Sequence, residues 1–374
     1  MNTMIPTENG DVLTGVRRFL GQLLENGVVD ALFVPLEVDG GAVLPALVTD
    51  PERLERANPL APAMPINAAR AVGALTGKHA PERLGAILRP CEIRALIELV
   101  KLQQASLDGV TLIGIDCPGT YELSDYVEKK RLGEISLDEI LVAAGEGEIP
   151  TLDGLAPRPA CQMCTQPVPE HTAIHLQIFG MNPDEGIPIE LDNEIGSRVQ
   201  GLVDANGAGA KRRELIEPLL SRRNQARAQE IEAMQQQMAS NGGIASLFAT
   251  CIRCHNCMTA CPICYCKTCL FRTAAFDHKP EHYFSSARRK GAQRMLDDTL
   301  LFHMTRLNHM STSCVSCGMC TSACPSDIPV GMIFTAVGTQ VQSAFDYLPG
   351  RDAAEPLPLI TFQANEWTEI GESQ

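Results

Sequence analysis

The stretch CIRCHNCMTACPICYCKTC, residues 251–269, places seven cysteines within nineteen positions. Such a density of thiols is typical of a disulfide framework, a zinc site or an iron–sulfur site. The chain has 15 cysteines in 374 residues, and its start, MNTMIPTENGD, has neither the basic nor the apolar segment of a secretory signal. We therefore expect a cytoplasmic protein, in which reduced thiols favour metal binding over disulfides.

Two cysteine runs share the spacing C-x2-C-x2-C-x3-C and are each followed by proline. They are Cys251, Cys254, Cys257 and Cys261, and Cys314, Cys317, Cys320 and Cys324. In ferredoxins with this spacing, three thiolates of a tight loop hold one 4Fe-4S cube and the fourth ligates the other cube. The spacing thus predicts one cube on Cys251, Cys254, Cys257 and Cys324, and another on Cys314, Cys317, Cys320 and Cys261. Zinc is disfavoured, because zinc sites usually stop at two C-x2-C pairs.

The segment between the two runs is longer than a minimal ferredoxin needs. Residues 291–311 have a helical pattern, which predicts a ferredoxin module with an inserted helix. His303 and His309 lie on this segment. We interpret them as polar residues packed beside a cluster rather than as ligands.

The front of the chain alternates short apolar runs with helical patterns. Strands are expected at 28–38, 42–50, 84–90 and 110–119, and helices at 12–27 and 91–102. This alternation predicts an α/β domain with a partly parallel sheet.

Two cysteines of the front domain lie at the ends of predicted strands, and two form a C-x2-C pair. Cys91 and Cys117 are the strand-end residues, and Cys161 and Cys164 are the pair. Open α/β sheets bind ligands beyond the carboxyl ends of their strands, so the four predict a third cluster site. Any one of them alone is more typical of a small buried side chain.

Three cysteines remain after these assignments: Cys264, Cys266 and Cys269. They could form a fourth site with one further ligand, or they could line the surroundings of another cluster. We favour a further site, with its fourth ligand unidentified.

The sequence as a whole predicts an α+β protein of several domains. The expected parts are an α/β flavin and cluster domain (1–210), a helical linker (211–244), a two-cluster ferredoxin domain (245–340) and an extended C-terminal docking tail (341–374). We interpret the Lys and Arg residues of the linker as a solvated helix face, with contact to an acidic partner as the alternative. The tail is expected either to lie along another subunit or to be loose.

Charge and composition exclude other classes. The net charge is −14 and aromatic residues make up 5% of the chain, which disfavours a nucleic-acid binder. No apolar run reaches the length of a membrane span.

Several motifs together resemble one known family. They are RPCEIRA (89–95), Asp116-Cys117, Cys161-x2-Cys164, CPICYCKTC (261–269) and FHMTRLNHMSTSCVSCGMCTSACPSDIPV (302–330). The chain resembles the beta subunits of deazaflavin-linked formate dehydrogenases and of deazaflavin-reducing hydrogenases. The likeness extends over nearly the whole chain, and its motifs are most specific in the back half.

The resemblance implies FAD beside the front-domain cluster, with contacts at Gly10, Thr14 and Arg89. It also implies hydride exchange with the deazaflavin coenzyme. Two features depart from the family pattern. Asp11 replaces the second glycine of a glycine-rich loop, and residues 171–182 lack the Asp of an Ala-Asp-Ile turn. A front domain that conducts electrons without handling hydride is the alternative that these departures suggest.

The expected function is that of an iron–sulfur electron-transfer subunit. It would connect a catalytic formate dehydrogenase or hydrogenase subunit to a flavin, to a deazaflavin, or to a partner of the heterodisulfide reductase type. One alternative is a stand-alone flavoenzyme that reduces a small substrate. The other is a scaffold subunit with structural clusters. Catalytic residues are not identified by the sequence.

Overall fold

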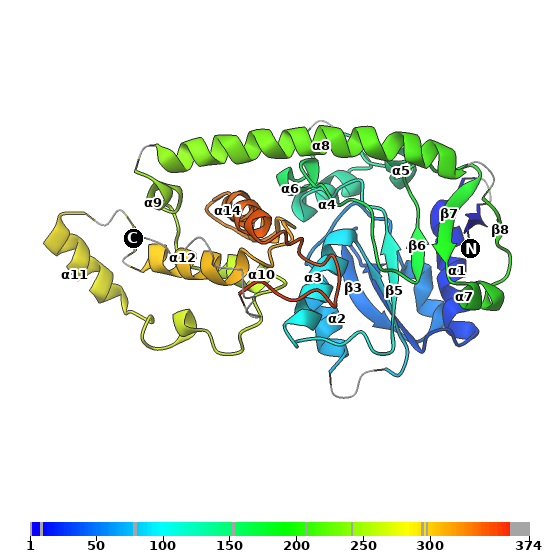
Figure 1. Ribbon diagram of the computed structural model, residues 1–374, viewed down its shortest axis with the longest axis horizontal. Helices are drawn as coiled ribbons and strands as arrows, with labels where there is room; N and C mark the ends of the chain where they lie inside the picture. Colours follow the sequence, from blue (N-terminus) through cyan, green and yellow to red (C-terminus); the bar gives the residue numbers. More distant parts are fainter. Residues whose placement is uncertain are drawn as a thin grey trace, which may run out of the picture.

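The computed structural model describes residues 2–7, 10–77, 81–151, 154–205, 208–240, 242–292, 295–296 and 298–359. Its front half is built on one eight-stranded sheet, and its back half consists of short helices and loops (Figure 1). One long helix, α8 (Ala208–Ala239), runs along both halves (Figure 1). The expected mixed α/β front domain is therefore confirmed.

The strand order in the sheet is β3-β2-β4-β5-β6-β7-β1-β8. The central strands β2, β4, β5 and β6 are parallel, and the pairs on either side of them are antiparallel. The strands are β1 (Asn2–Pro6), β2 (Ala31–Glu37), β3 (Val43–Val48), β4 (Leu84–Leu88), β5 (Val110–Ile115), β6 (Ile174–Leu176), β7 (Gly186–Leu191) and β8 (Val203–Asp204).

The front helices are α1 (Val12–Glu25), α2 (Ala69–Leu75), α3 (Pro90–Lys101), α4 (Leu123–Arg131), α5 (Leu137–Gly145), α6 (Pro159–Gln162) and α7 (Asn193–Arg198). The back helices are α9 (Ile244–Leu247), α10 (Asn256–Ala260), α11 (Pro280–Lys290), α12 (Thr299–Met310), α13 (Met319–Ser322) and α14 (Val330–Ala344). Two short 3-10 helices cover Pro51–Arg56 and Leu270–Arg272.

The junction between β4 and α3 positions Cys91. Every residue of β4 is buried, as expected for a central parallel strand. Pro90 suits the first position of α3, because that position needs no backbone N–H donor. The carboxylate of Glu92 accepts hydrogen bonds from the backbone N–H groups of Arg89 (2.8 Å) and Ala68 (3.0 Å). Cys91 is thereby held in the first turn of a helix at the carboxyl end of the sheet.

Helix α8 corrects the interpretation of the linker. The predicted linker is largely one continuous helix, with Pro218 inside it. Arg212 and Arg223 are buried rather than solvated. Arg212 pairs with Asp116, and Arg223 donates to the carbonyl of Pro118. The prediction of a solvated basic face was wrong for these two arginines, because their targets lie on the front domain of the same chain.

One hydrophobic cluster joins the two halves. It includes Phe33 and Leu96 from the front, and Phe302 and Ile333 from the back. Arg227 of α8 adds a polar link by donating to Thr339 Oγ1 of α14 at 3.0 Å. The front sheet, α8 and the ferredoxin segment therefore pack on one another.

The C-terminal segment also differs from expectation. Residues up to Ala344 belong to α14, and the following residues lie along α3. Tyr347 donates to Glu98 Oε1 at 2.6 Å, and the Gly350 N–H donates to the same oxygen at 2.8 Å. The described part of the tail is thus docked on its own chain, and residues 360–374 lie outside the described residues.

The inserted helix is shorter than predicted. Helix α12 begins at Thr299, whereas residues 291 and 292, just after α11, are not helical. Within the described part of the chain, no helix has the length and apolar character needed to cross a bilayer.

Candidate metal centres

The two ferredoxin loops have matching backbones. In the first loop Arg253 and His255 have φ values of 56° and 63°, and at the same places in the second loop Ser316 and Gly318 have 57° and 73°. Left-handed backbone costs about 1–2 kcal/mol for a residue other than glycine. It bends each loop around its thiols, and the Arg253 N–H lies 3.4 Å from Cys251 Sγ. Strained loops of this kind are typical of functional sites.

The first thiol set joins the first loop to the last cysteine of the second run. Burial raises the pKa of Cys251, and the nearby Cys324 and Cys254 add to the increase. Burial also raises the pKa of Cys257, which has the same neighbours. The structure thus brings Cys251, Cys254 and Cys257 together with Cys324.

The second thiol set joins the second loop to Cys261, the last cysteine of the first run. Burial raises the pKa of Cys317 to about 12, with further contributions from Cys261 and Cys314. The pKa of Cys320 is raised well above its usual value by burial and by Cys261 and Cys317. The structure therefore brings Cys261 together with Cys314, Cys317 and Cys320.

The third set lies beyond the ends of β4 and β5. Cys91, Cys117, Cys161 and Cys164 line one pocket, and Cys317 of the second set lines it too. Burial raises the pKa of Cys117 to about 12. The pKa of Cys161 is lowered although burial opposes this, because the Arg158 guanidinium and Thr120 favour its thiolate.

The three remaining thiols line a separate hollow. Cys264, Cys266 and Cys269 share it with the cationic side chains of Arg70, Lys267 and Arg272. Burial raises the pKa of Cys264 to about 11, and Cys261 adds to the increase. The residues that line this hollow include no fourth thiol.

The donor chemistry of the three four-thiol sets fits iron–sulfur clusters, which are held by cysteine thiolates. Among the described residues, no group of three or more Cys, His, Asp or Glu side chains is placed to hold a single metal ion. A cube is ligated at its corners, so its thiolates surround a cluster rather than one ion. Arg306 Nε is buried beside the first set and has no acceptor among the described residues. A cluster sulfide would supply one.

Two arginines that sequence reasoning missed contact these thiols. Arg306 Nη1 donates to Cys257 Sγ at 3.2 Å. Arg158 donates to Thr120 Oγ1 at 2.9 Å, to Met319 Sδ at 3.1 Å and to Cys161 Sγ at 3.7 Å. Arg306 is 49 residues from Cys257, so no local pattern marked it. Arg158 stands three residues before Cys161, and that spacing is the one signal that could have marked it.

The two histidines of the inserted segment differ. His303 is buried, its Nε2 lies 3.3 Å from Cys251 Sγ, and its ring stacks on Phe248 with centroids 3.8 Å apart. Burial lowers the pKa of His303 to about 3, so the ring is neutral. His309 is exposed. Only His303 is therefore packed beside a thiol set in the way that the sequence suggested.

The residues predicted to contact FAD lie in different surroundings. Arg89 lines the pocket of the third thiol set. A Cβ added at Gly10 would lie 3.3 Å from Asp184, in the turn between β6 and β7. The Asp11 carboxylate accepts a hydrogen bond from the Thr14 N–H at 2.9 Å and caps α1. This carboxylate occupies the N-terminal end of α1, where the free backbone N–H groups of a helix could otherwise bind a phosphate.

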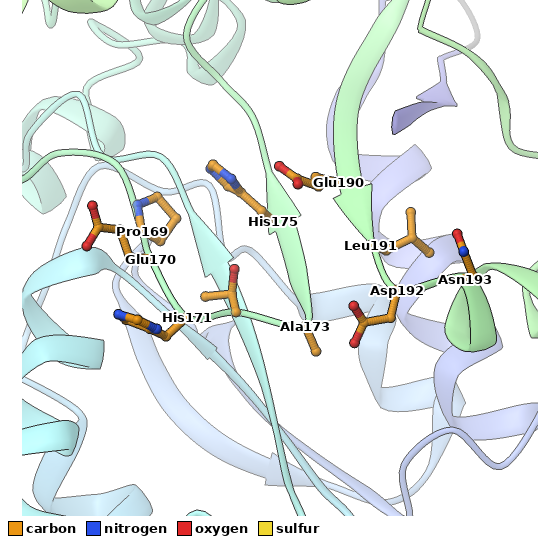
Figure 2. A pocket seen from close by; sticks show the side chains of 10 residues that line it. Pro169, Glu170, His171, Ala173, His175, Glu190, Leu191, Asp192 and Asn193 are labelled. Atoms are coloured by element: carbon orange, nitrogen blue, oxygen red, sulfur yellow. The ribbon is translucent and has the colours of Figure 1, made fainter. Parts of the chain in front are cut away.

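A large polar hollow of about 770 Å³ lies beside β6 and β7 (Figure 2). Its lining includes His171, His175, Glu170, Glu190 and Asp192. Three carboxylates make this hollow unfavourable for the pyrophosphate of a dinucleotide.

A match to a protein family model indicates the kind of domain in the back half of the chain. Residues 247–328 match the family model described as a 4Fe-4S dicluster domain. This segment contains both cysteine runs. The chain therefore has a 4Fe-4S dicluster domain behind a mixed α/β domain.

Two curated relatives are more specific. The chain is 26% identical over 321 residues to the F420-dependent formate dehydrogenase subunit beta of Methanocaldococcus jannaschii, with 78% of this chain and 80% of that protein covered. It is 25% identical over 389 aligned positions to the F420-dependent formate dehydrogenase 1 subunit beta of Methanococcus maripaludis, with 94% of each covered. The resemblance stated from the sequence motifs is thereby confirmed.

One solved structure also matches. It is a chain of the F420-reducing NiFe hydrogenase complex from Methanosarcina barkeri, 14% identical, with a TM-score of 0.46 and coverage of 62% of this chain and 92% of that chain. That likeness is too weak to support an argument.

Proposed function

We propose that this chain is the electron-transfer subunit of an oxidoreductase complex of the formate dehydrogenase or hydrogenase type. It would carry three 4Fe-4S clusters, one on each four-thiol set. Such clusters transfer single electrons when bound. The observation that carries the proposal is that Cys317 of the second set lines the pocket formed by the third set. The third set therefore adjoins the dicluster domain.

Close packing at this junction supports a continuous path. A Cβ added at Gly318 would lie only 2.4 Å from Ala160 Cβ, so the second loop touches the helix that carries Cys161. Arg158 reaches across the same junction to Met319 and, at 3.4 Å, to Ser322. These contacts join the second loop to the segment that carries Cys161.

The partner follows from the relatives. Both curated relatives are named as beta subunits of formate dehydrogenases, which implies a separate subunit that acts on formate. We propose a catalytic formate dehydrogenase or hydrogenase subunit as electron donor. A partner of the heterodisulfide reductase type, and a fourth cluster on Cys264, Cys266 and Cys269, stay predictions.

FAD also stays a prediction of the resemblance. The Asp11 cap disfavours the Gly10–Thr14 loop as its phosphate site. Arg89, beside the third thiol set, is the residue of the three that still supports a flavin next to a cluster. Absorbance of anaerobically isolated protein, after removal of the clusters by acid, would reveal a released flavin.

The test is reduction by the partner. The full chain, isolated anaerobically with the subunits that co-purify, should show its cluster absorbance bleach when formate or hydrogen is added. The chain alone should be inert towards both and fully reducible by dithionite. Clusters that stay oxidised in the active complex would support the scaffold alternative. Turnover of a small substrate by the lone chain would support the flavoenzyme alternative.

A further inference from the structure

Arg306 lies on α12, the helix inserted between the two cysteine runs. Its Nη1 donates to Cys257 Sγ at 3.2 Å, and its Nη2 donates to the Cys257 carbonyl at 3.1 Å. The guanidinium also stacks against two aromatic rings, 4.8 Å from the Phe334 centroid and 5.6 Å from that of Phe302. These contacts fix its position and direction.

The charge of Arg306 is buried, since the residue is only 4% exposed. Its hydrogen bonds to the sulfur and the carbonyl of Cys257 place this charge beside the first set.

Among the described residues, Arg306 contacts the sulfur and the carbonyl of Cys257 and two aromatic rings, and no carboxylate pairs with it. A buried cation without a counter-charge costs several kcal/mol. The negative charge of thiolate-ligated clusters would offset this cost. The unpartnered Nε gives a further donor for that anionic group.

A hydrogen bond to a ligand sulfur and a nearby positive charge both stabilise the reduced cluster, which carries one more electron. We propose that Arg306 is a positioning residue that raises the reduction potential of the cluster on Cys251, Cys254, Cys257 and Cys324. It acts through its bond to Cys257 and through its charge. This inference rests on the proposed function, because it requires clusters that accept electrons.

The experiment is a redox titration of the full chain, isolated anaerobically and followed by EPR. The variants are Arg306→Met, which removes charge and donors, and Arg306→Lys, which keeps the charge. Arg289→Met is the matched control, because Arg289 is exposed on α11. Iron and acid-labile sulfide are counted in every sample to establish that the clusters are loaded.

Arg306→Met should make reduction of one cluster at least tenfold less favourable, a fall of about 59 mV for one electron. Arg306→Lys should recover part of that fall, and Arg289→Met should match the parent chain. Fully loaded Arg306→Met with an unchanged potential would overturn the inference. Loss of the cluster from both Arg306 variants would also overturn it, since it would assign a structural role. A parent chain without iron would instead refute the proposed function.

Discussion

Arg212 of α8 and Asp116 at the end of β5 form a buried ion pair, in which Nη2 donates to Oδ1 at 2.9 Å. Asp116 is also 2.9 Å from His175 Nε2, and it accepts from the Phe179 N–H at 3.1 Å. The carboxylate of Asp116, the residue before Cys117, thus contacts both α8 and β6. The pair fixes the long helix against the edge of the third thiol site.

Replacing Arg212 by Met should destabilise the chain by about 3 kcal/mol, because it leaves the buried Asp116 charge without its main counter-charge. Urea unfolding followed by circular dichroism measures the change. Arg213→Met, at an exposed position of the same helix, should change stability by less than about 0.5 kcal/mol. Equal losses in the two variants would show that the pair is not the cause.

The same carboxylate predicts an acid dependence. Burial alone would raise the pKa of Asp116, but hydrogen bonds from His175 and Arg212 lower it below its ordinary value of 3.8. A carboxylate with a lowered folded pKa contributes stability that is present above its unfolded pKa and is lost as pH falls through the folded value. The urea concentration at the unfolding midpoint, measured from pH 7 down to pH 3, should therefore decrease once the pH is below about 4.

Asp116→Asn should flatten this acid dependence at the expense of stability at pH 7. Asp125→Asn, at an exposed position of α4, serves as the control and should keep the parent profile. If Asp116→Asn kept the full acid loss of the parent, other carboxylates would have to account for it.

Iron content tests the three sets. The parent chain should contain about 12 iron atoms and a similar amount of sulfide, as three cubes require. Cys91→Ser should bring this to about eight and leave the ferredoxin signals unchanged, because Cys91 belongs only to the third set. Loss of all iron would contradict the separation of that set from the dicluster domain.

Cys266→Ser is the companion variant, because Cys266 is exposed in the hollow of the three remaining thiols. A parent chain with about 16 iron atoms that loses four in this variant would assign a fourth cluster to the hollow. An iron content of about 12 atoms in both the parent chain and the variant would mean that these three thiols hold no cluster.

Gly318→Ala should weaken the junction between the second and third sets. Gly318 has φ +73°, and the added Cβ would lie 2.4 Å from Ala160 Cβ. We expect a loss of about 2 kcal/mol or more, combining backbone strain with the clash. Gly291→Ala is the matched control, since its φ is +81° and no described residue lies within 4 Å of the added atom. It should lose only about 1 kcal/mol, in thermal unfolding followed by circular dichroism.

Local patterns predicted much of the fold. Apolar runs and helical periodicity located β4, β5, α1 and α3 to within a few residues. Cysteine spacing grouped the residues of the two ferredoxin loops, because a short loop leaves few ways to arrange its thiols. The antiparallel strands β7, β1 and β8 were not predicted, since pairing between distant segments leaves no mark in local sequence.

Long-range polar contacts were the main omission. Arg212, Arg223 and Arg306 lie in segments that read as amphipathic or solvated, yet each has its partner far along the chain. The docking of Tyr347 on Glu98 was missed for the same reason. A sequence shows that a charge exists, whereas burial and pairing depend on which surface folds over it.

Helix α8 has a mechanical consequence. Its 32 residues span about 48 Å, and it is bonded to the front domain through Arg212 and to α14 through Arg227. A rigid helix attached to both halves restricts their motion relative to each other. The rate of electron transfer between clusters within the chain should then be independent of solvent viscosity. Glycerol should slow only the association with partner proteins.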